Sequence, residues 1–537
     1  MKRKIVIILL SFVFFTGKAQ HKECLSLFTD HDLYVSGETL LLKVFAPANE
    51  KSGIVNIDLV SSVGKKIVGI NIEIIEYQSD GFIYLPDSLS SGCYLLRSST
   101  RTNNTLTIKE LFIVNRFVGL PESNTVTRPV VVLPMNESLV SEIKITGIQS
   151  QYKTGEIGHS TIQIPSELLK QIVGNILVEI VKITPEYKST TFLIKSDSLR
   201  SPIPVKEGII LDGLVTDAKT TQPFQNAVVY LSIPDSIPEF QYFITGKDGR
   251  FYFQIEKYYG KMPLVIQCFA REKFRFLKIE IIDSKNVSSL TPSFTANIFM
   301  PALRKTVDQK IDAVTFRKIF NQQEITIQPN RIVKRDKYPF YGMPTIVIDP
   351  QLFIDLPNFN EISRELLPGV KYRNYNRIPT LQVFNAAQQV FFNEQPLLLL
   401  DGIPIRDLNV IKDMGSKDID KVEICQSERF FGDLIFPGVI AIYTSKADYS
   451  RVAESNDLIK VNLDVIQPRA TLNNSPDKKL TEPDLREVLV WNPSTKPDTT
   501  IILDFQTSDI HGNFKLIIRG KTIDGTNFFK EQIFEVK

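Results

Sequence analysis

Short alternating runs of Val, Ile, Phe, Tyr and Thr fill this chain from end to end, and they constrain its fold more than any other feature. Gly, Pro, Asn and Asp stand between the runs, as in β-strands joined by turns. Helical spacing is scarce, and the better candidates for it are residues 166–172, 301–319 and 361–367. At about 100–150 residues per domain, 537 residues correspond to about four domains. We therefore predict a mainly β fold: a string of immunoglobulin-like β-sandwiches with one small α+β domain.

The first 19 residues predict a signal peptide. Basic residues 2–4 precede an apolar run at 5–15, and Gly17–Lys18–Ala19 offers small residues for cleavage before Gln20. The apolar run is shorter than the roughly 20 residues that span a bilayer, and Cys24 lacks the context of a lipidated cysteine. We expect a secreted chain with no transmembrane span of its own, and peripheral association with a membrane stays open.

The overall charge gives no case for a nucleic-acid partner. The net charge of +3 comes from the leader, which holds four basic and no acidic residues. The remaining chain carries 59 basic and 60 acidic residues. A near-neutral surface does not attract nucleic acid or anionic membranes over long distances.

Cysteine and histidine residues are few and scattered. They are Cys24, Cys93, Cys268, Cys425, His21, His31, His159 and His511. We favour buried thiols for the cysteines, with a Cys24–Cys93 bridge as the alternative. His31, between Asp30 and Asp32, is expected in a solvated loop. The histidines are isolated from one another, and neither a Gly-x-Ser-x-Gly elbow nor a Walker loop occurs. We predict no metal, no cofactor, no catalytic residue and no enzymatic activity.

A short pattern, Tyr-x-Ser/Thr-Gly-Glu, occurs at residues 34–38 and again at 152–156, each time just before a strand-like run. We expect the glycines to form the turn and the tyrosines to cover the end of a sandwich core. The residues concerned are Tyr34, Gly37, Glu38, Tyr152, Gly155 and Glu156.

Residues 25–118 resemble a macroglobulin-like β-sandwich of the α2-macroglobulin superfamily. The resemblance rests on LYVSGETLLLKVFA, IVNIDLVSSVGKKI and a closing Gly92–Cys93–Tyr94 strand. Residues 125–205 match the same family through the second Tyr-x-x-Gly-Glu pattern and would form a second such sandwich. The thioester motif Cys-Gly-Glu-Gln of the family is absent, which removes covalent trapping.

Residues 208–292 are similar to the carboxypeptidase regulatory-like domain, a small transthyretin-like sandwich. The matching runs are LDGLVTDAKTTQPFQNAVVYLSI and FITGKDGRFYFQI, with a turn at Asp248–Gly249. The resemblance implies an accessory module without zinc or peptidase residues.

Residues 340–446 resemble the plug domain of TonB-dependent outer-membrane receptors, in the order RELLPGV, PLLLLDGIPIRD, DIDKVEI and FFGDLIFPGVIAIYTSK. Asp401–Gly402 is predicted to be a two-residue hairpin turn, because both residues tolerate positive φ. We read 293–339 as a connecting segment. Residues 455–537 are expected to form a C-terminal sandwich with Trp491 in its core, since too few residues follow the plug-like segment for a receptor barrel.

Together these resemblances imply a non-catalytic scaffold or protein-interaction component of the bacterial envelope. We expect it in the periplasm or at the cell surface, associated with the outer membrane, docking to an outer-membrane barrel or receptor assembly. Two alternatives stay open: an exported adhesin or ligand-binding protein, and a plug subunit that acts in trans on an outer-membrane transporter.

Overall fold

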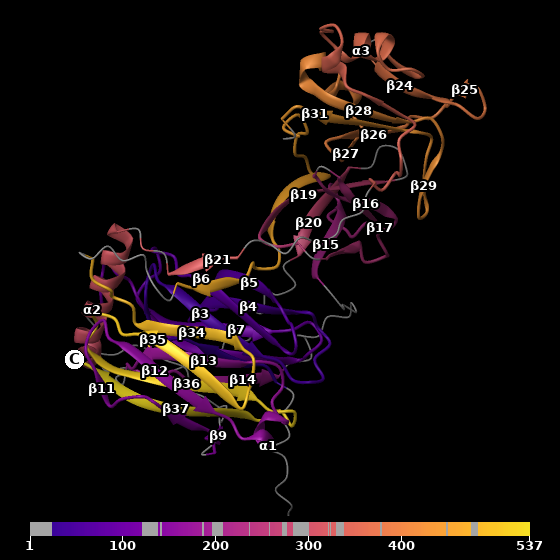
Figure 1. Ribbon diagram of the computed structural model, residues 1–537. Coiled ribbons are helices and arrows are strands. Elements are labelled where there is room, and N and C mark those ends of the chain that lie inside the picture. The colour runs from indigo at the N-terminus through magenta and orange to yellow at the C-terminus, as the bar shows by residue number, and fades with distance from the viewer. Residues whose placement is uncertain are drawn as a thin grey trace, which may run out of the picture. The chain divides into compact units, whose positions relative to one another are not determined.

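The computed structural model describes the chain from Cys24 onward except for short gaps, and it is mainly β (Figure 1). The described residues are 24–120, 138–139, 142–184, 187–195, 208–235, 237–256, 258–270, 276–282, 300–320, 322, 324–328, 338–375, 378–446, 449–473 and 482–537. The proposed signal peptide lies outside them. The chain forms two compact units, the first from residues 1–209, 285–331 and 466–537, the second from 210–284 and 332–465.

The first sandwich of the first unit has a three-stranded and a larger sheet around one apolar core. The smaller sheet contains β1 (Ser26–Thr29), β3 (Thr39–Phe45) and β6 (Gln78–Tyr84). The larger contains β14 (Thr191–Lys195), β8 (Thr105–Val114), β7 (Gly92–Ser99), β4 (Ile54–Ser61) and β5 (Lys66–Glu73), with β2 (Leu33–Val35) beside β8. Strand alternation points Leu40, Leu42 and Val44 into this core.

The second sandwich joins two segments that are far apart in the sequence. One sheet contains β10 (Lys144–Thr146), β12 (Ile157–Gln163) and β35 (Thr500–Gln506). The other contains β11 (Gln151–Tyr152), β37 (Asn527–Val536), β36 (Gly512–Lys521), β13 (Ile176–Lys182) and β34 (Val488–Thr495), with β9 (Ser138–Leu139) beside β37.

This arrangement corrects two predicted boundaries. The sandwiches expected at 125–205 and 455–537 are one sandwich, because β12 pairs with β35 and β13 lies between β34 and β36. In addition, β14 belongs to the first sandwich, where it pairs with β8. Strand alternation identifies each strand, but it carries no information about which distant strand will cover its open edge.

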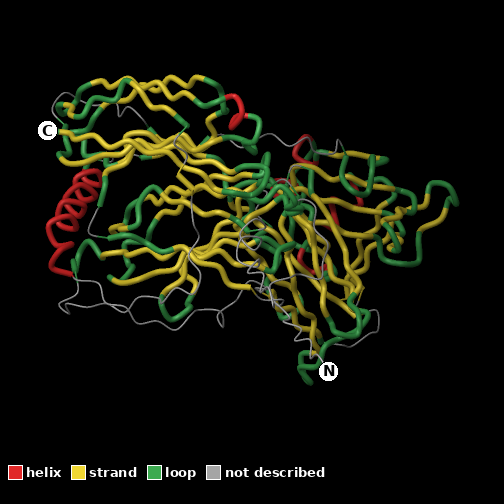
Figure 2. Tube along the Cα trace, turned by 90° about the horizontal axis from the view of Figure 1, so that it is seen from below, coloured by secondary structure: helices red, strands yellow, loops and turns green. Residues whose placement is uncertain are grey.

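Helix α2 (Met300–Ile319) confirms the helix expected at 301–319, and it is the long red coil of Figure 2. Its Leu303 and Val307 pack against Phe112 and Tyr187 on the first sandwich. A short strand, β21 (Ile325–Ile327), follows and pairs with β33 (Ala470–Leu472). The helix and the strand of the connecting segment are therefore part of the first unit.

The second unit contains the sandwich expected at residues 208–292. Its sheets contain β18 (Arg250–Ile255), β15 (Ile209–Asp217) and β20 (Leu277–Ile282), and β17 (Glu239–Ile244), β16 (Ala227–Ile233), β19 (Lys261–Ala270) and β32 (Leu458–Asp464). Strand β32 was expected in the C-terminal sandwich, but it pairs with β19 over seven residues. Without β32, β19 would be an edge strand with unpaired backbone N–H and C=O groups, and β32 pairs with these groups.

The segment 340–446, for which the sequence predicts a plug-like module, completes the second unit. Its main sheet contains β22 (Ile346–Ile348), β28 (Ile419–Cys425), β31 (Val439–Thr444), β26 (Leu397–Leu400) and β27 (Ile403–Ile405). The other strands are β23 (Val370–Tyr375), β24 (Ile378–Asn385), β25 (Val390–Phe391), β29 (Arg429–Phe431) and β30 (Leu434–Phe436). The short helices are α3 (Phe359–Glu365), η3 (Pro350–Leu352), η4 (Leu408–Val410) and η5 (Ser416–Asp418). Helix α3 and, in the second sandwich, α1 (Ser166–Leu169) lie where helices were expected.

Two further expectations concern single side chains. All four cysteines fall within the described residues and are buried thiols, so Cys24 and Cys93 are not bridged here. Trp491 is buried, but it packs with Phe28 and Phe45 of the first sandwich rather than in the core of its own. None of the helices among the described residues is both long and apolar enough to cross a membrane.

Candidate functional site: a buried charge cluster beside the first turn motif

The two Tyr-x-x-Gly-Glu motifs form the same turn with the same hydrogen bonds. In the first copy, the Tyr34 hydroxyl accepts from the backbone N–H of His31 at 3.1 Å. The Glu38 carboxylate accepts from the N–H of Val35 at 2.6 Å. Gly37 has a φ of 88°, in the left-handed region that favours glycine.

The second copy repeats this geometry. Its Tyr152 hydroxyl accepts from the N–H of Gln149 at 3.0 Å, and Glu156 accepts from the N–H of Lys153 at 2.7 Å. Gly155 has a φ of 72°. Both tyrosines are buried in the core of their sandwich, as expected. The role of each glutamate in closing its own turn was not anticipated.

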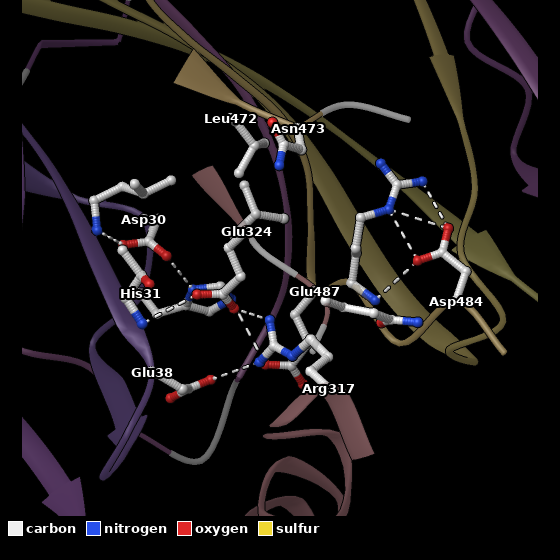
Figure 3. A pocket seen from close by; sticks show the side chains of 14 residues that line it. Asp30, His31, Glu38, Arg317, Glu324, Leu472, Asn473, Asp484 and Glu487 are labelled. Atoms are coloured by element: carbon white, nitrogen blue, oxygen red, sulfur yellow. Dashed lines mark hydrogen bonds and ion pairs between the residues drawn. The ribbon is translucent and has the colours of Figure 1, made fainter. Parts of the chain in front are cut away.

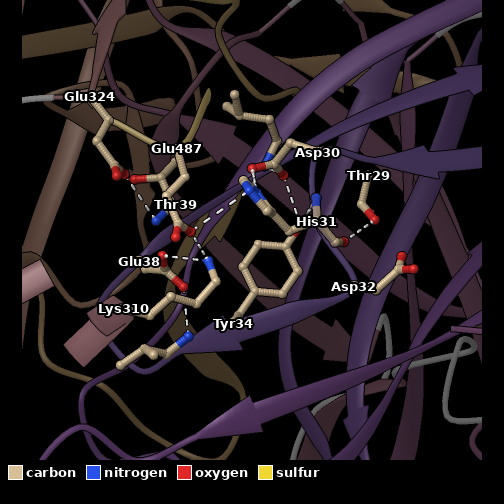
Figure 4. Close-up of polar contacts among 12 residues, drawn as sticks. Thr29, Asp30, His31, Asp32, Tyr34, Glu38, Thr39, Lys310, Glu324 and Glu487 are labelled. Atoms are coloured by element: carbon tan, nitrogen blue, oxygen red, sulfur yellow. Dashed lines mark hydrogen bonds and ion pairs between the residues drawn. The ribbon is translucent and has the colours of Figure 1, made fainter. Parts of the chain in front are cut away.

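Only the first motif faces a helix. The second carboxylate oxygen of Glu38 lies 3.5 Å from the Lys310 ammonium and 3.6 Å from the Arg317 guanidinium, both on α2. Lys310 also forms an ion pair with Glu487, which directly precedes β34 (Figure 4). One lysine thus joins the first sandwich, α2 and the strand leading into the second sandwich.

Lys310 occupies the buried stripe of α2. It follows Leu303 and Val307 and precedes Val314 at helical spacing, and only 1% of its side chain is exposed. Burial opposes its charge, but the carboxylates of Glu38 and Glu487 outweigh this effect and raise the pKa of the amine. A lysine centred in an apolar helical stripe was the sequence signal that could have revealed the site.

Glu487 is the acidic centre of the cluster. Besides Lys310, it pairs with Lys182 at 3.3 Å, and its carboxylate lies 3.8 Å from Nε2 of His31. Burial disfavours its ionised form, but Lys310 and then His31 and Lys182 oppose this effect and hold the pKa of Glu487 well below its usual range. We call Asp30, His31, Glu38, Lys310 and Glu487 the Lys310 cluster.

The loop before β2 belongs to this cluster and is not solvated, contrary to the expectation for His31. Asp30 accepts hydrogen bonds from the Tyr34 hydroxyl at 2.7 Å and from the N–H of Leu41 at 2.9 Å. Nδ1 of His31 lies 2.8 Å from the Asp30 carboxylate, and both residues are buried. Asp32 turns away and pairs with Lys109 at 2.8 Å. The polar side chains pack inward because each finds a partner there.

A cavity of about 50 Å³ adjoins the cluster (Figure 3). Arg317 pairs with Glu324 at its edge, and Arg486 makes hydrogen bonds to both carboxylate oxygens of Asp484. A space this small holds a few water molecules at most. Within the described residues, no group of three or more His, Cys, Asp or Glu side chains is arranged to hold a metal ion. The geometry is that of an ion-pair network that fastens three chain segments together.

The remaining turn residues lie in the second unit. Gly249 has a φ of 67°, and the Asp248 carboxylate accepts from the N–H of Arg250 at 3.2 Å. Asp401 and Gly402 have φ values of 49° and 83° and join β26 to β27, as predicted.

Asp401 does more than turn the chain. Its carboxylate accepts from the backbone N–H and the hydroxyl of Thr444, both at 2.7 Å, and so ties the hairpin to the end of β31. The aspartate of the Asp-Gly pair is therefore fixed by tertiary contacts as well as by turn chemistry.

Comparison with known proteins yields neither a matching family model nor a matching curated protein. Solved structures with some similarity include an α2-macroglobulin from Salmonella reacted with methylamine, at 10% identity and a TM-score of 0.22 over 95% of this chain and 39% of that one. A trypsin-activated α2-macroglobulin from Escherichia coli gives 9% identity and a TM-score of 0.22, over 96% and 41% of the two chains.

A tetra-tandem repeat from the extending region of a large adhesion protein gives 9% identity and a TM-score of 0.13, over 96% and 98% of the chains. This chain spans about two fifths of the length of the macroglobulins. TM-scores this far below 0.5 carry no argument about function, and the resemblances drawn from sequence motifs remain predictions.

Proposed function

We propose that this chain is a non-catalytic envelope protein that works by contacting other proteins, and that residues 340–446 are its contact module. One observation carries the proposal: the β29–β30 hairpin presents Phe430 and Ile435 to solvent as a cross-strand pair, 65% and 62% exposed. Exposed apolar pairs on an ordered element are typical of protein-binding surfaces.

The hairpin is held in place from its other face. The Phe431 ring packs against Phe240 and Phe340, with centroids 5.4 and 5.3 Å away. At the turn, the N–H of Asp433 donates to the Tyr242 hydroxyl at 2.8 Å. An ordered ribbon loses little conformational entropy when a partner covers it, which favours binding.

A second exposed apolar segment lies in the same module. Leu352, Phe353 and Ile354 are consecutive and all more than half exposed, at the end of the short helix η3. Three adjacent apolar side chains in water are unfavourable unless a partner covers them. By its resemblance to a receptor plug, the module would meet an outer-membrane barrel or receptor assembly.

Site-specific photo-crosslinking in intact envelopes tests this function. A photoreactive residue in place of Phe430 should yield a discrete adduct with an outer-membrane protein. The same residue in place of Val63, an 82% exposed side chain in the β4–β5 turn, serves as the control. A photoreactive residue in place of Phe353 should label the same protein. The double variant Phe430→Ser, Ile435→Thr should lose most of this second adduct. Identical adducts from positions 430 and 63, or no adduct from position 430, would overturn the proposal. Turnover of peptides or esters by the purified chain would overturn its non-catalytic part.

A further inference from the structure

A second and larger cleft lies within the first unit, on the other side of the loop that carries His31. Its volume is about 660 Å³, which is within the range of small-molecule sites. One wall comes from β1, β8 and the loop after β1, and the other from the outer face of β13, β36 and β37. Five basic side chains line it against three acidic ones, although the mature chain as a whole is nearly neutral.

The acidic side chains of this cleft are already occupied. Asp32 pairs with Lys109 at 2.8 Å and also accepts from the Ser189 hydroxyl at 2.8 Å. Glu179, which is 2% exposed, accepts from the Arg519 guanidinium at 3.2 Å. The third, Asp30, belongs to the Lys310 cluster. The surplus charge of the cleft is therefore positive.

Arg519 is fixed in position before any ligand arrives. Besides its bond to Glu179, its guanidinium carbon lies 5.0 Å from the ring centroid of Phe28 and 6.0 Å from that of Phe529. An arginine clamped by a buried carboxylate and two rings keeps a planar set of donors at a defined place, which suits carboxylate and phosphate groups.

Lys515 lies on the same face of β36, four residues before Arg519. Among the described residues, its ammonium has no ion-pair partner within 4.0 Å. Burial and, next, the charge of Arg519 lower the pKa of its amine. An anion in the cleft would offset both effects, since it would neutralise the two neighbouring cations.

We propose that this cleft binds the oxyanion head group of a small molecule, a carboxylate, phosphate or sulfate, with Arg519 and Lys515 as its cationic partners. This site is separate from the contact surface of the plug-like module. It would make the first unit a ligand-responsive part of the chain, because the ligand would touch both sandwiches.

Thermal unfolding of the mature full-length chain tests the site, with the fluorescence of Trp491, the only tryptophan, reporting on the first unit. Succinate, phosphate and sulfate each replace chloride at constant ionic strength. At least one should raise the unfolding temperature with a saturable concentration dependence. Which anion does so distinguishes the three head groups.

Matched variants separate specific binding from general salt effects. Lys515→Gln should weaken the apparent affinity for that anion at least tenfold, while Lys144→Gln, at an exposed position on β10, should leave it unchanged. Sulfate and phosphate also stabilise proteins by exclusion from their surface, without saturation. A shift that does not saturate, or one that is equal in both variants, would overturn the proposal, as would the absence of any anion-dependent shift.

Discussion

The two Tyr-x-x-Gly-Glu turns share their sequence pattern, their left-handed glycine and their internal hydrogen bonds, but the glutamate carboxylate of only the first forms ion pairs with a helix in the described contacts. Glu156 lies at the surface of the second sandwich and serves its own turn. Glu38 serves its turn with one oxygen and faces Lys310 and Arg317 of α2 with the other. The glutamate of the motif closes its own turn in both copies. It forms buried ion pairs as well only in the first copy, where α2 brings cationic side chains close to it.

Removal of Lys310 should have the largest effect on this contrast. Lys310→Met leaves Glu38 and Glu487 buried without their shared cation, which typically costs about 3–5 kcal/mol. Urea unfolding followed by Trp491 fluorescence measures the loss. Lys170→Met, which removes an exposed pair with Glu167, should change the free energy of unfolding by less than about 0.5 kcal/mol. Similar losses in both variants would contradict a special role for Lys310.

The same variant should also change the pH dependence of stability. In the wild type the pKa of Glu487 is lowered, so its ionised form adds stability above its unfolded pKa, and this stability is lost only in strong acid. Without Lys310, burial should raise that pKa, and protonation should then favour the folded state. As the pH falls from about 8 to about 5, the stability deficit of Lys310→Met relative to wild type should therefore shrink. A constant difference across this range would contradict the assigned ion pair.

Substitution of the two glutamates tests the comparison directly. Glu38→Gln keeps an acceptor for the N–H of Val35 but removes the charge facing α2, and should cost about 2 kcal/mol. Glu156→Gln should cost less than about 0.5 kcal/mol, because its charge has no buried partner in the described contacts. Equal costs in urea unfolding would show that the ion pairs of Glu38 contribute nothing measurable.

The smallest expected difference is between the two glycines. Alanine at either position must adopt positive φ, which costs about 1 kcal/mol. A Cβ at Gly155 meets no atom within 4 Å, whereas one at Gly37 would lie 2.3 Å from the carboxylate of Asp87. Asp87 is held by Lys318 of α2 at 2.9 Å. Gly37→Ala should therefore cost about 1 kcal/mol more than Gly155→Ala, and the reverse order would contradict this account.

Local chemistry made part of this structure predictable. Strand alternation and turn residues indicated a mainly β chain, the positive φ at Asp401 and Gly402, and the helix at 301–319, since each depends on neighbours within a few residues. The same reasoning failed for His31. A histidine between two aspartates suggests a solvent-exposed loop. His31 is buried instead, because the distant carboxylate of Glu487 lies beside its ring.

The sequence by itself determined where strands, turns and the long helix lie, because side-chain periodicity and backbone preferences act over a few residues. Only the tertiary structure decided that two segments more than 300 residues apart share one sandwich, through the β12–β35 pairing. It likewise decided that Lys310 meets carboxylates from residues 38 and 487. The physical reason is the same in both cases: a strand edge or a buried charge specifies the kind of partner that it needs, and the fold alone selects which distant residue supplies it.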